Sequence, residues 1–277
     1  MEIPSSVIHL IQNALEEDIG PGDITTSLLI PEESESRALY IAKGKFVLAG
    51  LPFAREVFRI LDPSAVFKTF HSEGARVRKG DVFAEVFGKT RAILSGERVS
   101  LNILQRLCGI ATLTSMYVDR IKGLKAKIVD TRKTTPCERF MEKYAVRVGG
   151  GYNHRFGLFD GILIKDNHIE AVGSIKEAVK LAKRNHHLSR IEVEVENLHD
   201  LEEAIGAGVD IVMLDNMPIN DIKEAVKISN GRVILEASGG IKLENVKEIA
   251  ETGVDLISVG ALTHSATAAD ISLKIVK

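Results

Sequence analysis

The chain has 277 residues, with 36 Lys and Arg against 38 Asp and Glu, which gives a formal net charge of −2. This length corresponds to one large domain or two ordinary ones, and such a chain buries about three quarters of its unfolded surface. The near-neutral charge argues against a general nucleic-acid or membrane-surface binder, because those proteins need a basic excess.

The N-terminal residues and the cysteines bear on the compartment. Residues 1–18 lack a basic region followed by a continuous apolar stretch, so they do not predict a signal peptide. No apolar run approaches the roughly 20 residues that cross a bilayer. The two cysteines, Cys108 and Cys137, are too few for a disulfide framework, and we expect each to be a free buried thiol. We therefore expect a soluble, cytoplasmic protein.

The first hundred residues predict a mixed α/β domain. A helix with Ser5 or Ser6 as its N-cap is expected to end at Gly20. Alternating apolar residues interrupted by Gly74, Gly80 and Gly88 then indicate short strands joined by tight turns. The expected helices cover residues 6–17, 53–61 and 91–114, and strand-like patterns cover residues 37–51 and 71–88.

After Lys125, short apolar strands alternate with helices. The expected strands are 126–130, 161–165, 191–196, 211–215, 233–237 and 256–260, and helices are expected at 174–183, 200–207, 220–229 and 243–252. Repeated β-then-α units predict a parallel sheet, either open and doubly wound or closed as a barrel.

We favour an α/β fold with two domains. Residues 1–108 would form an N-terminal α/β sandwich-like domain, and residues 109–277 a six-stranded, TIM-like β/α barrel. A last helix would pack back on the N-terminal domain. The barrel is preferred to an open sheet because each expected strand runs into polar residues at its C-terminal end, where β/α folds carry their active sites.

One of these strands is unusually acidic. In residues 191–196 a period of two puts the aliphatic side chains on one face and Glu192, Glu194 and Glu196 on the other. Buried unpaired carboxylates are costly, so we expect Glu192 and Glu196 to be solvated or paired with Lys or Arg. Glu194, with Asp215 one βα unit later, is the candidate for hydroxyl or Mg²⁺-linked contacts.

Basic residues gather at the ends of other strands. They are Arg132, Lys133, His154, Arg155 and Lys165, close in sequence to the glycines 149–151. Arg is suited to bidentate contact with carboxylate or phosphate, so this set predicts an anionic substrate. His154 could be a general base or a neutral hydrogen-bond donor, and both readings stay open.

The last two strands end in small residues, Ser238-Gly239-Gly240 and Gly260-Ala261. In β/α barrels the final βα loops often bind a phosphate through backbone N–H groups, which predicts a phosphate site here. No nucleophile stands out, because no His is placed by sequence to activate Cys137.

At these positions the chain resembles the quinolinate phosphoribosyltransferase family, also called nicotinate-nucleotide pyrophosphorylase (carboxylating). The resemblance extends from the N-terminal helix to the last strand, with two small departures at Cys108 and Val148 and a Cys137 where Gly is usual. Its motifs are Glu17-Asp18 with Gly22-Asp23-Ile24-Thr25-Thr26, Glu97-Arg98 with Asn102, Asp130-Thr131-Arg132-Lys133-Thr134-Thr135-Pro136, Gly149 to Arg155, Leu163 to His168, and Glu236 to Gly240.

The resemblance implies an enzyme that joins quinolinate to phosphoribosyl pyrophosphate with Mg²⁺, giving nicotinate mononucleotide, pyrophosphate and CO₂. It also implies a homodimer, with a hexamer as a further assembly, in which Arg98 reaches the site of the other subunit. Lys133, Glu194 and Asp215 would be catalytic, with Mg²⁺ carried by the pyrophosphate near the two carboxylates. The substrate-binding residues would be Arg98, Thr131, Arg132, His154, Arg155, Lys165, Ser238, Gly239, Gly240, Gly260 and Ala261.

Two alternatives remain open from the sequence. One is a phosphoribosyltransferase acting on nicotinate or another anionic heterocycle, although the basic cluster favours an acceptor with two carboxylates. The other is a biotinyl- or lipoyl-type carrier, because residues 74–82 resemble the hairpin of such domains. The nearest Lys after that hairpin, Lys89, leads into an expected helix, which argues against a carrier.

Overall fold

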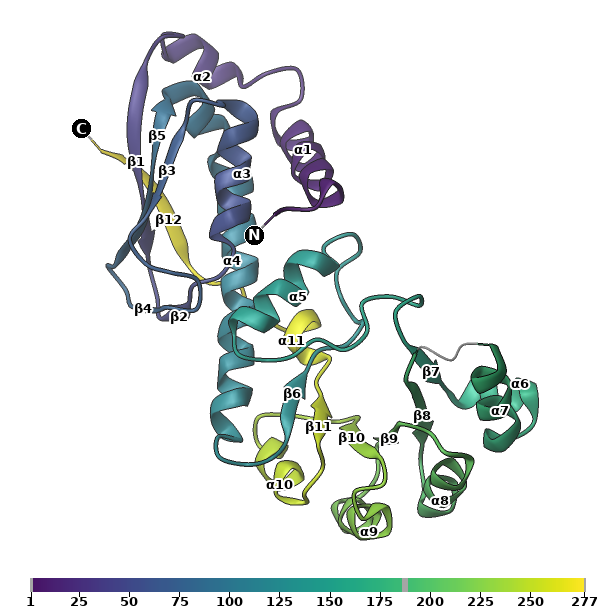
Figure 1. The fold of residues 1–277 in the computed structure, drawn as a ribbon. Coiled ribbons are helices and arrows are strands. Elements are labelled where there is room, and N and C mark those ends of the chain that lie inside the picture. Colours follow the sequence, from purple (N-terminus) through teal and green to yellow (C-terminus); the bar gives the residue numbers. More distant parts are fainter. Residues whose placement is uncertain (1, 186–188, 277) are drawn as a thin grey trace. The chain divides into compact units, whose positions relative to one another are not determined.

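The computed structural model describes residues 2–185 and 189–276 (Figure 1). The chain divides into two compact units. Unit 1 comprises Met1–Ser115, Thr134–Gly150 and Ser265–Lys277, and unit 2 comprises Met116–Lys133 and Gly151–His264. Residue 108, where the sequence places a domain boundary, lies inside helix α4 (Thr90–Arg120). The boundary itself stays a prediction.

Unit 1 is built around a four-stranded antiparallel sheet with the order β12-β1-β5-β3. Its core lies between this sheet and helix α3, where Tyr40, Phe58 and Phe83 are buried and the Tyr40 and Phe83 ring centroids are 5.7 Å apart. The elements are α1 (Ser5–Ile19), α2 (Ile24–Leu29), β1 (Glu35–Ala42), β2 (Phe46–Val47), α3 (Leu51–Leu61), β3 (Val66–Thr69), β4 (Arg76–Val77), β5 (Val82–Lys89), α5 (Arg139–Val148) and β12 (Ile271–Val276).

Three details of unit 1 differ from the sequence predictions. Helix α1 is preceded by Pro4, and no side chain caps its N-terminus, so neither serine is the N-cap. Helix α4 runs six residues beyond the predicted end. The C-terminal segment, expected as a helix, forms β12, which pairs antiparallel with β1 from Arg37↔Val276 to Ala42↔Ile271. An edge strand at the chain terminus thus completes the sheet.

The carrier-like hairpin is part of this same sheet domain. Its residues form β4 and β5, and β5 ends at Lys89, directly before α4 begins at Thr90. Lys89 also donates its backbone N–H to Asp62 Oδ2 at 2.9 Å. A helix therefore follows Lys89 in place of a second carrier strand, as predicted.

Unit 2 contains the six predicted parallel strands in the order β6-β11-β10-β9-β8-β7 (Figure 1). This is the order of a β/α barrel that is open between β6 and β7. Among the described residues, an isolated bridge links Val129, the last residue of β6, to Tyr152, which precedes β7 in the chain. The strands are β6 (Lys127–Val129), β7 (Ile162–Ile164), β8 (Ile191–Val195), β9 (Ile211–Asp215), β10 (Ile234–Ser238) and β11 (Leu256–Ser258).

Six helices in the described part of unit 2 lie between or after these strands. They are α6 (Asp166–Val172), α7 (Ile175–Asn185), α8 (Leu198–Ala207), α9 (Ile219–Ser229), α10 (Val246–Glu251) and α11 (Ala261–His264). Four of them, α7 to α10, were predicted, and their bounds agree with the expected ones to within three residues. Because all six strands are parallel, their C-terminal ends meet at one edge. Among the described residues, no helix is both long and apolar enough to cross a lipid bilayer.

Candidate active site

A pocket of about 570 Å³ opens at the C-terminal ends of the strands in unit 2. It brings together every predicted site residue except Arg98, Gly260 and Ala261. Its lining consists of Thr131, Arg132, Lys133, His154, Arg155, Leu163, Lys165, Glu194, Met213, Asp215, Asn216, Glu236, Ser238, Gly239, Gly240 and Ser258. A single cavity therefore carries both the basic residues and the acidic pair that the sequence placed at separate strand ends.

Several cationic side chains lie close together on one side of the pocket. Burial, and next the neighbouring Arg132, lower the pKa of the Arg155 guanidinium. Arg155 Nη1 donates to the Gly161 carbonyl at 2.9 Å, which fixes the guanidinium in place. Two guanidinium groups held close together repel each other, so an anion bound between them is stabilised.

Lys165 and Glu194 form an ion pair inside the pocket. Lys165 Nζ donates to Glu194 Oε2 at 2.6 Å, joining the end of β7 to β8. Both residues keep some exposure, so a ligand can reach them. Asp215 follows on β9 with partial exposure, and its Oδ2 accepts from Asn216 Nδ2 at 2.8 Å.

A carboxylate that sequence reasoning did not select positions the basic segment 153–155. Asp130 is fully buried at the end of β6. Its Oδ1 accepts the backbone N–H of His154 at 2.9 Å, and its Oδ2 accepts Asn153 Nδ2 at 2.6 Å. In the sequence Asp130 was only the first residue of a strand-end motif. Its role depends on a segment more than twenty positions away.

His154 faces two buried glutamates. Its Nδ1 accepts the Arg155 backbone N–H at 2.8 Å, so the ring proton sits on Nε2. That Nε2 lies 3.0 Å from Glu192 Oε2 and 3.7 Å from Glu236 Oε2. The prediction that Glu192 is solvated or paired with Lys or Arg is therefore wrong: it is 4% exposed and its partner is a histidine. Glu196 is exposed, as expected.

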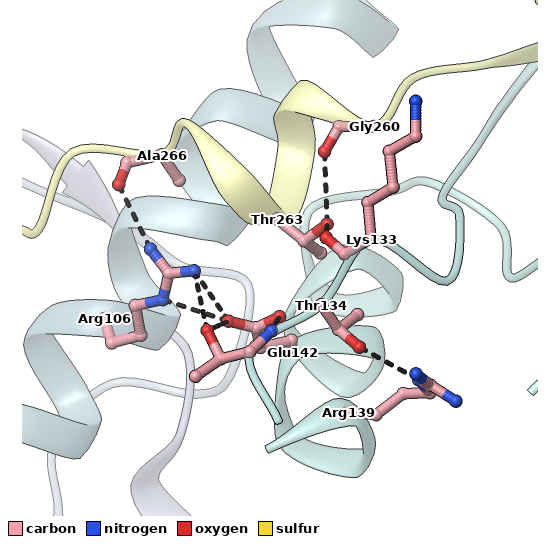
Figure 2. A network of polar contacts seen from close by, with 9 residues as sticks. Arg106, Lys133, Thr134, Arg139, Glu142, Gly260, Thr263 and Ala266 are labelled. Carbon is pink, nitrogen blue, oxygen red and sulfur yellow. Dashed lines mark hydrogen bonds and ion pairs between the residues drawn. The ribbon is translucent and has the colours of Figure 1, made fainter. Parts of the chain in front are cut away.

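Lys133 presents its side chain to the pocket while its backbone is anchored. Figure 2 shows Thr263 Oγ1 donating to the Lys133 carbonyl, at 2.8 Å. The Lys133 ammonium group makes no hydrogen bond or ion pair within the described residues. A Cβ on Gly260 would lie 3.1 Å from Lys133 Cδ, so Gly260 borders Lys133 even though it does not line the pocket.

The residues after Lys133 are held by a buried ion pair in unit 1. Glu142, on α5, is fully buried, and its Oε1 accepts from Arg106 Nη2 at 2.6 Å and from Thr135 Oγ1 at 2.9 Å (Figure 2). Its Oε2 accepts the Thr135 backbone N–H at 3.1 Å. The sequence prediction missed both Glu142 and helix α5, which carries it.

The glycine turn after β10 has a backbone that only glycine adopts readily. Gly239 and Gly240 have φ values of +86° and +60°. A Cβ on Gly239 would lie 2.1 Å from Asn216 Oδ1, so any side chain there would clash. Successive N–H groups in such a turn form a concave anion-binding surface.

Arg98 lies in unit 1 and lines a different cavity, of about 370 Å³. This cavity is bordered by α1, α4 and α5, with an apolar surface that includes Ile11 and Ile103 and charged groups that include Arg106 and Glu138. Burial and the nearby Glu142 raise the pKa of Glu138.

The cysteines differ from each other. Cys108 is buried, its Sγ contacts the backbone of Ala49, and burial raises its pKa to about 12, so it is an inert thiol as predicted. Cys137 is exposed, which contradicts the prediction of a buried thiol, and it adopts a φ of +67°. It is absent from the described lining of the pocket, consistent with the lack of a role as nucleophile.

The side chains suited to a hard cation in the pocket are Glu194 and Asp215, which offer carboxylate oxygens at its mouth. Elsewhere, on α8, His199, Asp200 and Glu203 bring possible metal-ligand atoms close together, with His199 exposed and the other two half-buried. We assign no metal site to them. For the set at His154, Glu192 and Glu236 we assign no metal ligand, since the imidazole N–H already faces Glu192.

Comparison with known proteins matches most of the chain to one family. Residues 23–108 match the family described as quinolinate phosphoribosyl transferase, N-terminal domain, and residues 110–274 match the corresponding C-terminal domain. A probable nicotinate-nucleotide pyrophosphorylase (carboxylating) of Bacillus subtilis is 47% identical over 267 residues, covering 96% of this chain and 92% of that protein.

Two further relatives agree with this match. A quinolinate phosphoribosyltransferase (decarboxylating) of Nicotiana glauca is 43% identical over 286 residues, covering 96% of this chain and 81% of that protein. The nicotinate-nucleotide pyrophosphorylase structure from Francisella tularensis superposes with a TM-score of 0.95 at 44% identity, covering 99% of this chain and 98% of that one.

Proposed function

This chain belongs to the quinolinate phosphoribosyltransferase family, enzymes of NAD biosynthesis, and we propose that the strand-end pocket of unit 2 is where it carries out the family's decarboxylating transfer. The reaction joins quinolinate to the ribose of phosphoribosyl pyrophosphate and releases pyrophosphate and CO₂. One observation carries the proposal: a cluster of cations and a pair of carboxylates line the same pocket.

The basic cluster suits the pyridine dicarboxylate. Arg132, His154, Arg155 and Lys165 would hold its two carboxylates, with Thr131 beside them. Rigid anchoring of both carboxylates orients the ring nitrogen toward the ribose, and this positioning lowers the entropic part of the barrier. The anchoring is supported by Asp130, which fixes the backbone that carries His154 and Arg155.

Glu194 and Asp215 suit the ribose end of the reaction. Departure of pyrophosphate builds positive charge at the ribose C1′, and fixed carboxylates nearby stabilise that charge. Lys133 has an unpaired ammonium group among the described residues and would lie between the two substrates. After transfer, the cationic ring nitrogen stabilises the electron pair left on the adjacent ring carbon when the carboxylate departs as CO₂, and a proton from solvent then takes the place of that carboxylate on the carbon.

The glycine turns suit the phosphate of phosphoribosyl pyrophosphate. Ser238, Gly239 and Gly240, together with Gly260 and Ala261 after β11, would bind it through backbone N–H groups. Mg²⁺ carried by the pyrophosphate would neutralise charge on this leaving group, and the carboxylates of Glu194 and Asp215 are the hard oxygen donors that it prefers.

Assembly and location extend the proposal. Arg98 does not line the unit 2 pocket, and we propose that it reaches the pocket of a second copy in a homodimer, with a hexamer as a further assembly. We also propose a cytoplasmic location and no nucleic-acid or membrane partner, on the strength of the near-neutral charge.

The test is incubation with quinolinate, phosphoribosyl pyrophosphate and Mg²⁺. We expect equal amounts of pyrophosphate, CO₂ and nicotinate mononucleotide. A parallel reaction replaces quinolinate with nicotinate, for which we expect little turnover because half of the carboxylate contacts are lost. Absence of both nucleotide and pyrophosphate from the first reaction contradicts the proposal, and efficient use of nicotinate supports the alternative acceptor.

A further inference from the structure

The pocket holds a buried carboxyl group that the proposed function does not use. Glu236, on β10, lines the pocket, yet its side chain is only 1% exposed. Neither of its oxygens makes a hydrogen bond within the described part of the chain. An ionised carboxylate in that position has lost its water without gaining a donor, which is strongly unfavourable.

The neighbouring imidazole cannot serve two carboxylates. His154 has one ring proton, on Nε2, because its Nδ1 accepts the Arg155 backbone N–H. Nε2 lies 3.0 Å from Glu192 Oε2 and 3.7 Å from Glu236 Oε2, so the proton is directed to Glu192. Two carboxylates that share one site do not both ionise readily, and Glu236 is the member left without a donor.

The groups that shift the pKa of Glu236 lie on neighbouring strands and strand ends of unit 2. Burial raises its pKa most, and Glu192 on β8 raises it next, to about 7. His154 and the nearby Ser258 hydroxyl on β11 act in the opposite direction, and Asp130 after β6 adds a smaller increase. The Ser258 hydroxyl itself lies 3.5 Å from the Ala237 carbonyl, to which it donates.

Building on the proposed function, we propose that Glu236 is a further substrate-binding residue, which is protonated whenever the dicarboxylate occupies the pocket. Binding of quinolinate would then take up one proton from solvent, forming an O–H bond on Glu236 and changing no other bond. Glu236 lines the pocket, and Glu192 lies behind it on the other side of the His154 imidazole contact.

The physical reason is charge. Quinolinate brings two negative charges to a pocket whose lining residue Glu236 already has two buried acidic neighbours, Glu192 and Asp130. An ionised Glu236 would add a further negative charge beside the basic cluster and weaken its attraction for the substrate. A neutral carboxyl removes that repulsion and can donate a hydrogen bond to a substrate carboxylate.

Proton uptake is measured by titrating the enzyme with quinolinate calorimetrically in buffers of different ionisation enthalpy. We expect uptake to rise from pH 6 to pH 8 toward one proton per quinolinate, since burial and Glu192 raise the pKa of Glu236 toward neutrality and a carboxylate that is ionised in the free enzyme must regain its proton on binding. The KM for quinolinate should rise about tenfold per pH unit above 7. The KM for phosphoribosyl pyrophosphate should lack this rise.

Three variants test the assignment. Glu236→Gln is a neutral mimic of the protonated carboxyl, so it should abolish the uptake and keep the quinolinate KM flat between pH 6 and 8.5. Glu192→Gln should move the uptake to lower pH, because Glu236 loses its repelling neighbour. Glu73→Gln is the control: Glu73 is a partly buried carboxyl in unit 1 whose pKa is also raised by burial, and it should leave the uptake unchanged.

The outcomes separate the two proposals. If the wild-type enzyme turns over quinolinate but the heat of quinolinate binding is the same in all buffers, no proton is taken up, and the role of Glu236 is contradicted even if no variant folds. Uptake that persists in Glu236→Gln contradicts it as well. Failure of the wild type to turn over quinolinate contradicts the proposed function instead.

Discussion

Buried carboxyl groups occur in both units, but the units differ in how completely the carboxyl oxygens are hydrogen-bonded. In unit 1, Asp62 accepts the backbone N–H groups of Ser64 and Lys89, and Glu142 accepts from Thr135 and Arg106. In unit 2 the buried Asp130 is also satisfied, but one oxygen of Glu192 and both oxygens of Glu236 have no hydrogen-bond donor among the described residues. A fully hydrogen-bonded carboxylate stabilises a fold, whereas an unsatisfied one beside a pocket costs stability and is expected to serve a ligand.

The largest effect should come from removing the charged groups at the pocket mouth. Lys133→Ala and Glu194→Ala should each lower kcat by about 100-fold or more, because under the proposed function each would remove a charge from beside the reacting atoms. Thermal unfolding should change little, since Lys133 is exposed and Glu194 keeps solvent access. Lys180→Ala, which removes an exposed partner of Glu177 on α7, is the matched control for kcat. Wild-type turnover in either pocket variant would exclude that residue from the mechanism.

Removing Glu142, the hydrogen-bonded carboxylate of unit 1, should lower the stability of the fold instead of acting on kcat. Glu142→Ala leaves Arg106 without its buried partner and should lower the free energy of unfolding by about 3 kcal/mol. Glu142→Gln keeps hydrogen-bond acceptors and should cost less. Glu224→Ala breaks an exposed pair with Lys227 and should cost under about 0.5 kcal/mol. Urea unfolding measures all three, and equal losses for Glu142→Ala and Glu224→Ala would contradict the comparison.

Glu236 should make stability depend on pH in a defined direction. Its pKa is raised from 4.5 to about 7, so in this window the native state keeps a proton that the unfolded state has released. The free energy of unfolding contributed by this group therefore falls as the pH rises through that window. Relative to wild type, Glu236→Gln should gain about 2–3 kcal/mol between pH 5 and pH 8. A difference between the two proteins that does not vary with pH would show that Glu236 is ionised throughout.

The smallest effect concerns backbone strain. Cys137 in unit 1 and Asn216 in the unit 2 pocket both have positive φ values, of +67° and +53°. Asn tolerates this region better than Cys. Cys137→Gly should therefore raise the melting temperature slightly, by a gain below about 1 kcal/mol, because relief of strain is partly offset by greater freedom of the unfolded chain. A lower melting temperature would show that the Cys137 side chain makes a stabilising contact.

Local sequence patterns were enough to predict most of the regular elements. The β/α alternation after Lys125 identified all six parallel strands, because each is a short apolar run followed by polar residues. The short helices α2 and α11 were missed, and so were α5 and α6, for physical reasons. In α5 the buried Glu142 and Lys143 interrupt the apolar stripe, and α6 buries none of its residues. Strand β12 was missed because its partner, β1, comes from the other end of the chain.

What the sequence determined by itself is the chemistry at each strand end: guanidinium and ammonium groups after some strands, carboxylates on others, and glycine turns after the last two. Parallel strand ends converge, so these groups could be expected in one pocket. Only the tertiary structure decided which charges face each other. Asp130 accepts a hydrogen bond from the backbone of His154, and the ring Nε2 of His154 faces Glu192, while Glu236 is left without a donor among the described residues. Such pairings depend on distances between segments far apart in the chain, and they set the protonation of the pocket.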